Sequence, residues 1–318
     1  MDKQVYQVGS MTAKPSTKAA GFLEVPDTGV RMPMTIVNGG APGPGVLITA
    51  GVHGGEYPPI EATIRLARDL DPTRVCGQVV VIPIVNPLAF QARQQYVVPQ
   101  DGKNLNRQFP GNASGTYSER MAYTIMTEVV SKVDVWLDLH GGDIHEALVP
   151  FTIYSDSAAA DVVSRSRELA EAYGIKYVVA SDSVKGATYG ASAAAGVPSI
   201  LAEAGQVGQL DEENTLIHIK GCRNVLQHLG VLPGDPDPVA PIKLLQEFSW
   251  LRAEQMGCWY PSVKIGDIVE AGQLVGVIKD YFGDSLAECH APAAGTVLFL
   301  VTSLAVNEED PLVGIGVE

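Results

Sequence analysis

The chain has few cysteines, few basic residues and no long apolar run, and each shortage excludes a class of protein. Its four cysteines are scattered over 318 residues, at Cys76, Cys222, Cys258 and Cys289. Such spacing lacks the close pairs of a thiolate zinc site and the density of a small secreted disulfide framework. We therefore expect reduced thiols in a cytoplasmic protein.

Basic residues are scarce, with 22 Lys and Arg against 36 Asp and Glu and a formal net charge of −14. This charge repels phosphate backbones and anionic lipids, so nucleic acids and membrane surfaces are poor candidate partners. No segment stays apolar for about 18 residues, and the N-terminal stretch lacks the apolar core of a signal peptide. We expect a small-molecule partner, and the sequence leaves a homo-oligomer open.

Apolar runs alternate with helical patterns from Gly45 onward. Hydrophobic residues make up 46% of the chain, which also has 33 glycines and 21 prolines, as in a globular protein with many tight connections. The predicted strands are 45–52, 79–85, 133–140, 176–181 and 199–205. Strands that alternate with helices predict an α/β fold, with a mixed, largely parallel sheet flanked by helices.

The character of the sequence changes after a segment rich in proline and acid, Pro233–Pro241. Such composition is typical of a linker, and short β runs separated by glycines follow it. We therefore predict a catalytic domain over residues 1–237 and a small C-terminal all-β domain over residues 238–318.

Three residues have the arrangement of a metal site. His53 and Glu56 stand three apart where a predicted strand meets a helix, so one turn can aim both side chains at one point. His140 ends a separate predicted strand, and Gly141 and Gly142 let the chain bend away from a crowded centre. Two nitrogens and a carboxylate oxygen suit one Zn²⁺ ion per chain, with a fourth position left to water.

Each polar residue near these strand ends also has a simpler explanation. A histidine taken singly often only satisfies a core or loop hydrogen bond. Asp138 points to the same side of its strand as His140, where it would orient that imidazole. The alternative is a carboxylate that accepts hydrogen bonds from loop amides. Glu203 ends an apolar strand, where burial would raise its pKa toward that of a general base. The alternative is a strand-end carboxylate that bonds to the backbone or to an arginine.

A long polar loop, Asn86–Gly111, supplies candidate substrate-binding residues. Arg107 offers a planar fork for a carboxylate, and Asn106 an amide beside it. Arg93 could stabilise the negative oxygen that forms when water attacks a carbonyl. His145, after the predicted metal strand, could line the pocket. The alternative for each is a solvated or structural side chain.

Four motifs occur in the order HGGE, NLNR, LDLHGG and AEAG. In this order they resemble the succinylglutamate desuccinylase and aspartoacylase family, which has a zinc carboxypeptidase-like fold. The resemblance covers most of the chain, because the C-terminal segment is similar to the second domain of that family and to a barrel-sandwich fold of the lipoyl type. We expect this segment to be structural or to cover the site.

The resemblance implies a role for each candidate. Zinc would be held by His53, Glu56 and His140, while Glu203 would be the base. The remaining implied roles are substrate carboxylate binding for Asn106 and Arg107, and oxyanion stabilisation for Arg93.

The implied activity is zinc-dependent hydrolysis of the amide in a small N-acylated amino acid or related compound. Two alternatives remain at this point. One is a zinc carboxypeptidase that acts on short peptides, and the other is a binding protein that keeps the fold without hydrolysis. The acyl group and the amino acid are not determined by any motif.

Overall fold

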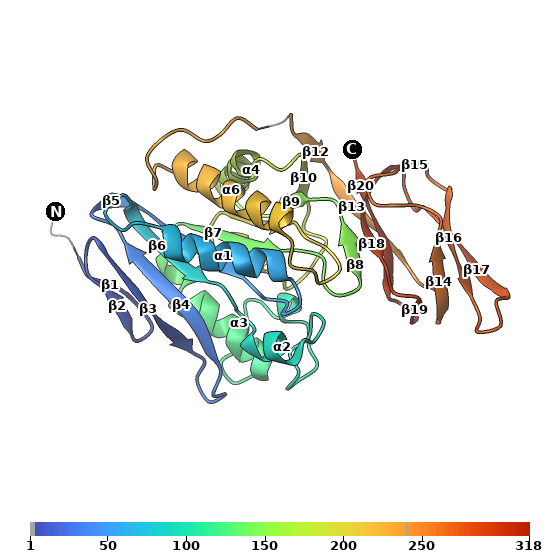
Figure 1. Cartoon of the computed structure of the whole chain (residues 1–318), viewed down its shortest axis with the longest axis horizontal. Helices are drawn as coiled ribbons and strands as arrows, with labels where there is room; N and C mark the ends of the chain where they lie inside the picture. Colours follow the sequence, from blue (N-terminus) through green and yellow to red (C-terminus); the bar gives the residue numbers. More distant parts are fainter. Residues whose placement is uncertain (1–3, 240) are drawn as a thin grey trace.

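A mixed sheet dominates the computed structural model, which describes residues 4–239 and 241–318 (Figure 1). Within these residues the sheet has nine strands. In spatial order they are β12 (Lys243–Leu245), β10 (Tyr177–Ala180), β9 (Phe151–Tyr154), β11 (Ser199–Glu203), β7 (Val135–His140), β5 (Ala41–Ala50), β6 (Cys76–Ile82), β4 (Arg31–Asn38) and β3 (Thr17–Glu24). A small hairpin, β1 (Tyr6–Val8) and β2 (Met11–Ala13), lies beside it.

The centre of the sheet is parallel. Strands β6, β5, β7 and β11 run in one direction, while β3, β4 and β9 introduce the antiparallel pairs. Strand β7 is buried along its whole length, as expected for a central strand covered on both faces. The prediction of a mixed, largely parallel sheet with flanking helices is confirmed.

Helices cover both faces of this sheet (Figure 1). The helices α1 (Tyr57–Asp69), α4 (Ala160–Tyr173) and α6 (Glu212–His228) pack in one core cluster, and α3 (Tyr117–Glu128) packs in another. The shorter helices are α2 (Pro87–Ala92) and α5 (Thr188–Ala194), with 3-10 turns η1 (Leu105–Arg107) and η2 (Val130–Lys132). Among these described helices, none is long and apolar enough to cross a bilayer.

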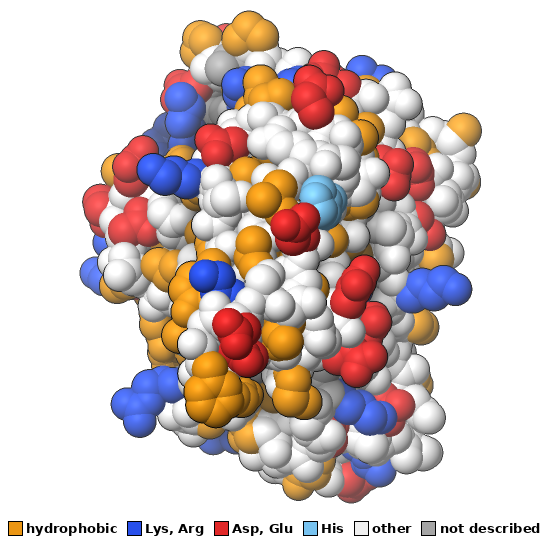
Figure 2. All heavy atoms as spheres, turned by 90° about the vertical axis from the view of Figure 1, so that its right-hand side faces the viewer, with side chains coloured by type: hydrophobic (Ala, Val, Ile, Leu, Met, Phe, Trp, Pro, Cys, Tyr) orange, Lys and Arg blue, Asp and Glu red, His pale blue; other side chains and the backbone are white. Residues whose placement is uncertain are grey.

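The C-terminal part forms two further sheets. One has the order β13 (Glu247–Arg252), β20 (Pro311–Val317), β18 (Gly295–Val301) and β15 (Ile268–Val269). The other has the order β17 (Ser285–His290), β16 (Leu274–Lys279), β14 (Gly257–Pro261) and β19 (Ala305–Val306). On the face in Figure 2, acidic, basic and apolar side chains are interspersed rather than gathered by charge.

Each of the two parts of the chain contributes a short strand to a sheet of the other part. Strand β8 (Glu146–Leu148) follows the metal strand β7 in sequence but pairs with β18 of the C-terminal part. Strand β12 lies beyond the predicted domain boundary yet extends the large sheet beside β10. The boundary at residues 237 and 238 stays a prediction, and contacts across it tie both parts together.

Candidate metal centre

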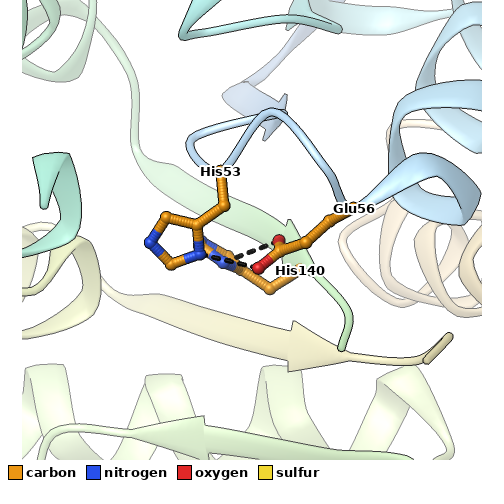
Figure 3. Close-up of side chains that lie close together, drawn as sticks. All are labelled: His53, Glu56 and His140. Carbon is orange, nitrogen blue, oxygen red and sulfur yellow. Dashed lines mark hydrogen bonds and ion pairs between the residues drawn. The ribbon is translucent and has the colours of Figure 1, made fainter. Parts of the chain in front are cut away.

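Three side chains converge at the carboxyl edge of the large sheet (Figure 3). His53 lies in the turn after β5, Glu56 is the N-cap residue of α1, and His140 is the last residue of β7. Because β5 and β7 are parallel neighbours, they end at the same edge. One ligand atom from each of the three residues lies within 4.8 Å of the other two.

The glycines of HGGE and HGG permit this crowding. A Cβ atom on Gly55 would lie 2.1 Å from Oδ1 of Asp143, and one on Gly142 would lie 2.2 Å from the carbonyl oxygen of Glu146. Real Cβ atoms do not approach so closely, so these two positions need glycine. The turn after β5 and the loop after β7 are therefore packed directly against each other.

Each imidazole presents Nδ1 to Glu56. The Nδ1 atom of His53 lies 2.6 Å from Oε1, and Nδ1 of His140 lies 3.1 Å from Oε2. Nε2 of His53 lies 3.1 Å from Oδ1 of Asn104, and Nε2 of His140 lies 2.9 Å from Oδ2 of Asp138. These outer oxygens accept a hydrogen bond from Nε2–H, which leaves Nδ1 free to bind a metal.

Asp138 is anchored deep in the core. Thr49 and Thr188 each donate a hydroxyl hydrogen bond of 2.6 Å to its carboxylate, and Trp136 Nε1 donates to the Thr49 hydroxyl at 2.7 Å. A carboxylate with this many donors is held in one orientation. Asp138 therefore orients His140, as the strand position suggests.

The electrostatics are those of a cation site. Burial alone would raise the pKa of Glu56, but the charges and hydrogen bonds of His140 and His53 outweigh it and lower that pKa to about 2. Burial opposes charge on His140, yet Glu56 and Asp138 hold its pKa well above the ordinary value. Glu56 Oε2 is buried, and among the described residues its partner is Nδ1 of His140, in an ion-pair contact that lacks good hydrogen-bond geometry. Two nitrogens and this carboxylate fit zinc, which would replace the positive charge of a proton.

Glu203 lies beside the ligands at the end of β11, directly opposite His140 in the register of β11 and β7. Its Oε2 atom is buried and has no hydrogen-bond partner. Burial raises the pKa of Glu203 well above its ordinary value, and although His140 opposes the shift, the charges of Glu56 and Glu146 add to it. A carboxyl group with such a pKa can both accept and return a proton.

The NLNR motif forms the turn η1 at the rim of this centre. Asn106 is buried, and its Oδ1 accepts a hydrogen bond of 2.9 Å from the amide of Thr188. Arg107 is open to solvent, yet the surrounding protein lowers its pKa chiefly by burial, with Glu146 and Glu203 opposing the shift. Arg107 therefore stands at the accessible edge of the centre, where a guanidinium can meet a substrate.

Two other predicted residues have side chains that form no hydrogen bond with the described residues of the metal centre. Arg93 is exposed at the C-cap of α2, with φ at 54°, and its guanidinium makes no hydrogen bond or ion pair to a described residue. His145 is exposed after β7, and only its carbonyl oxygen is engaged, by the amide of Thr302. A role for either side chain stays a prediction.

Several residues at the site were missed by the sequence reasoning. Asn104 stands two positions before the predicted Asn106, and Thr188 comes from a distant helix. Tyr96 packs edge-on against His53, with ring centroids 6.5 Å apart, while its amide donates to buried Asp143 at 2.8 Å. Only the NLNR motif could have indicated Asn104, because the other contacts join loops far apart in sequence.

Charged residues of the C-terminal part influence two residues near the metal centre. The charge of Arg252 contributes to the lowered pKa of Arg107, and burial together with the charge of Asp310 raises the pKa of Tyr96. Both groups therefore lie within electrostatic range of the site. Two cavities of about 380 and 580 Å³ also occur, beside α3 and between α1 and α6, away from the metal ligands.

Comparison with known proteins gives a consistent match. The family model for the succinylglutamate desuccinylase/aspartoacylase catalytic domain matches residues 42–229. The chain is also 31% identical over 311 residues to the N-alpha-acetyl-L-2,4-diaminobutyric acid deacetylase of Halomonas elongata, covering 93% of this chain and 90% of that protein.

Solved structures extend the likeness to the whole chain. A succinylglutamate desuccinylase/aspartoacylase from Rhodobacter sphaeroides is 28% identical, with a TM-score of 0.83 and coverage of 94% of this chain and 95% of that one. The product-bound ectoine utilization protein of Ruegeria pomeroyi covers 100% of both chains, with a TM-score of 0.88. Its identity is 24%, so this second likeness concerns the fold alone.

Proposed function

The chain belongs to the succinylglutamate desuccinylase/aspartoacylase family, and we propose that it hydrolyses the amide bond of a small N-acylated amino acid. The observation that carries this proposal is the convergence of His53, Glu56 and His140 beside Glu203, whose buried Oε2 has no hydrogen-bond partner among the described residues. Zinc held by the three ligands would polarise the carbonyl and lower the pKa of a bound water.

Glu203 acts as the proton carrier. It takes a proton from the attacking water and returns it to the nitrogen of the leaving amine, so one residue serves as base and then as acid. Its free oxygen beside His140 and its raised pKa support this role. Glu56 and Asp138 cannot replace it, because each is already held by imidazole or hydroxyl groups.

Arg107 binds the substrate carboxylate, and Asn106 lies beside it with its side-chain oxygen already engaged by Thr188. A planar guanidinium suits a carboxylate because it donates two parallel hydrogen bonds. For Arg93 the proposed oxyanion role has a direct test. Unchanged turnover in Arg93→Ala would remove it from the mechanism.

Small substrates are favoured over peptides by the position of the C-terminal part. Strand β8 leads from the metal centre into the C-terminal sheet, and Arg252 and Asp310 lie in electrostatic range of Arg107 and Tyr96. A peptide would need an open groove at this place. The binding-protein alternative gives no reason for an unpartnered, buried Glu203 beside a metal site.

The first experiment combines metal analysis of the purified protein with amine release from N-acetyl, N-succinyl and N-formyl amino acids. We expect one zinc per chain and metal-dependent release, both lost in His53→Ala. Acetylated 2,4-diaminobutyrate is the first substrate to test, given the activity named for the Halomonas relative. Zinc without release would favour the peptidase or the binding protein, and absence of zinc would contradict the proposal.

A cytoplasmic location is proposed from the state of the cysteines. All four cysteines are unpaired thiols, with Cys222 and Cys289 buried, as suits a reducing compartment. Assembly into a homo-oligomer stays a prediction that size-exclusion chromatography with light scattering would decide.

A further inference from the structure

Glu146 is a carboxylate beside the metal centre that the proposed reaction does not use. It is the first residue of β8, and its backbone is held from several directions. Its amide donates to the carbonyl of Asp143 at 2.9 Å, and its own carbonyl accepts from the amide of Val207 at 2.8 Å. Strand β8 also pairs it with Val301 of the C-terminal sheet, so the position of Glu146 is fixed by both parts of the chain.

The side chain of Glu146 is only half satisfied. Its Oε2 atom accepts a hydrogen bond of 3.1 Å from the amide of Asp143. Its Oε1 atom has no hydrogen-bond partner in the described structure, and no described Lys, Arg or His forms an ion pair with the carboxylate. Asp143 differs, because its two oxygens accept hydrogen bonds from the amides of Ile144 and Tyr96.

Contacts place Glu146 beside the turn that carries His53 and Glu56. Its Oε2 accepts from the amide of Asp143, and the carboxylate of Asp143 leaves no room for a Cβ atom on Gly55 of that turn. The charge of Glu146 also adds to the raised pKa of Glu203 and of Tyr96, and it opposes the lowering of the pKa of Arg107. Its own pKa is raised to about 7, mainly by burial and further by Glu56 and Asp143. Glu146 therefore lies in electrostatic range of a metal ligand, the base and the carboxylate-binding arginine together.

We propose that Glu146 binds a positively charged side chain of the substrate, so that the preferred substrate is an N-acyl diamino acid. This inference rests on the proposed function. Arg107 would hold the carboxylate of the amino acid, Glu146 would hold its side-chain ammonium, and the acyl amide would lie at the metal ligands and Glu203. An ammonium group would supply Oε1 with the charge-assisted hydrogen bond that the protein itself does not provide.

The competing explanation is that Glu146 only fixes the loop after β7 through its bond to Asp143. The two explanations differ in their dependence on substrate charge. A loop anchor would affect all substrates equally. An ammonium site would discriminate against an uncharged side chain, because such a side chain makes no charge-assisted hydrogen bond to the partly buried carboxylate of Glu146.

The test compares N-acetyl-L-2,4-diaminobutyrate with N-acetyl-L-norvaline, in which a methyl group replaces the ammonium. We expect wild type to prefer the charged substrate in kcat/KM by about 10- to 100-fold, the range of a hydrogen bond between charged groups. Glu146→Gln removes the charge with little change of shape and should abolish most of this ratio. Glu213→Gln, an exposed residue at the start of α6, is the matched control and should keep it.

Binding of the amine products gives a second readout that needs no turnover. In calorimetric titrations, L-2,4-diaminobutyrate should bind wild type more tightly than L-norvaline, and Glu146→Gln should reduce this difference at least tenfold. Equal losses on both compounds in Glu146→Gln would overturn the inference.

The two proposals fail separately. Hydrolysis of both acetylated compounds without preference contradicts the role of Glu146 and leaves the deacylase intact. Absence of any amide hydrolysis, with charge-selective binding that Glu146→Gln abolishes, contradicts the deacylase and keeps the ammonium site. Absence of hydrolysis with equal binding of both amines overturns both.

Discussion

The acceptors behind the two imidazoles decide how well the site holds a metal. Nε2 of His53 lies 3.1 Å from Oδ1 of Asn104, an acceptor that fixes the ring with Nδ1 directed at Glu56. We expect Asn104→Ala to weaken zinc affinity by about 10-fold, the lower end of such effects. Competition with a chelator measures it, and Asn112→Ala in an exposed loop is the matched control. Equal zinc affinity in both variants would show that Asn104 does not act on the metal.

The role of Glu203 is tested by separating metal binding from turnover. Glu203→Gln removes the titrating group but keeps the shape of the side chain. Because none of the three ligands changes, zinc content should stay at the wild-type level while kcat falls by about 10²- to 10⁴-fold. Full activity in this variant would refute the assignment.

The convergence of three candidate ligands could be predicted from sequence because a motif places two of them on one turn, while their role as ligands stays a prediction. His53 and Glu56 share such a turn, and His140 ends an obvious strand. The sequence analysis named His145 and did not consider Glu146, although neighbouring residues of a strand point to opposite faces. Which of the two faces the site depends on how β8 pairs with β18, about which the local sequence says nothing.

At the scale of elements, one buried histidine connects α6 to the strand that carries Glu203. Nε2 of His218 donates to the carbonyl of Ala204 at 3.0 Å, and its Nδ1 accepts from the hydroxyl of Tyr173 at 2.8 Å. Burial lowers the pKa of His218 to about 4. The neutral imidazole is therefore the form that the folded protein binds.

This pKa makes stability depend on pH. The unfolded chain takes up the proton near pH 6.5 and the folded chain only near pH 4, so the contribution is complete above pH 6.5 and is lost as the pH falls through this window. The total effect is about 3 kcal/mol. Urea unfolding at pH 5 and pH 8 should show a smaller pH dependence in His218→Gln than in wild type, whereas exposed His228→Gln should match wild type.

Prediction of elements followed their length and burial. Strands β5, β7 and β11 are long apolar runs, and their existence was clear from sequence, although β6 begins and ends three residues earlier than the predicted 79–85. Strands β8 and β12 have three residues each and exist only through partners far along the chain. No local pattern distinguishes such strands from loops.

At the scale of the whole molecule, the exchanged strands predict a single unfolding unit. Breaking the C-terminal sheet removes the partner of β8, and the large sheet loses its edge strand β12. Calorimetry of the full chain should therefore show one cooperative transition, with equal calorimetric and van't Hoff enthalpies. Two resolved transitions would show that the parts before and after residue 237 unfold independently.

The exchange of β8 also separates two functions in evolutionary terms. The proposed metal ligands lie in the turn after β5, at the N-cap of α1 and at the end of β7, whereas Glu146 lies on a strand whose partner belongs to the C-terminal sheet. On the proposed roles, substitutions in that sheet would move Glu146 while leaving the proposed ligands in place. A lineage could then change the amino acid it accepts through drift in the C-terminal part, with the chemistry at the other end inherited unchanged.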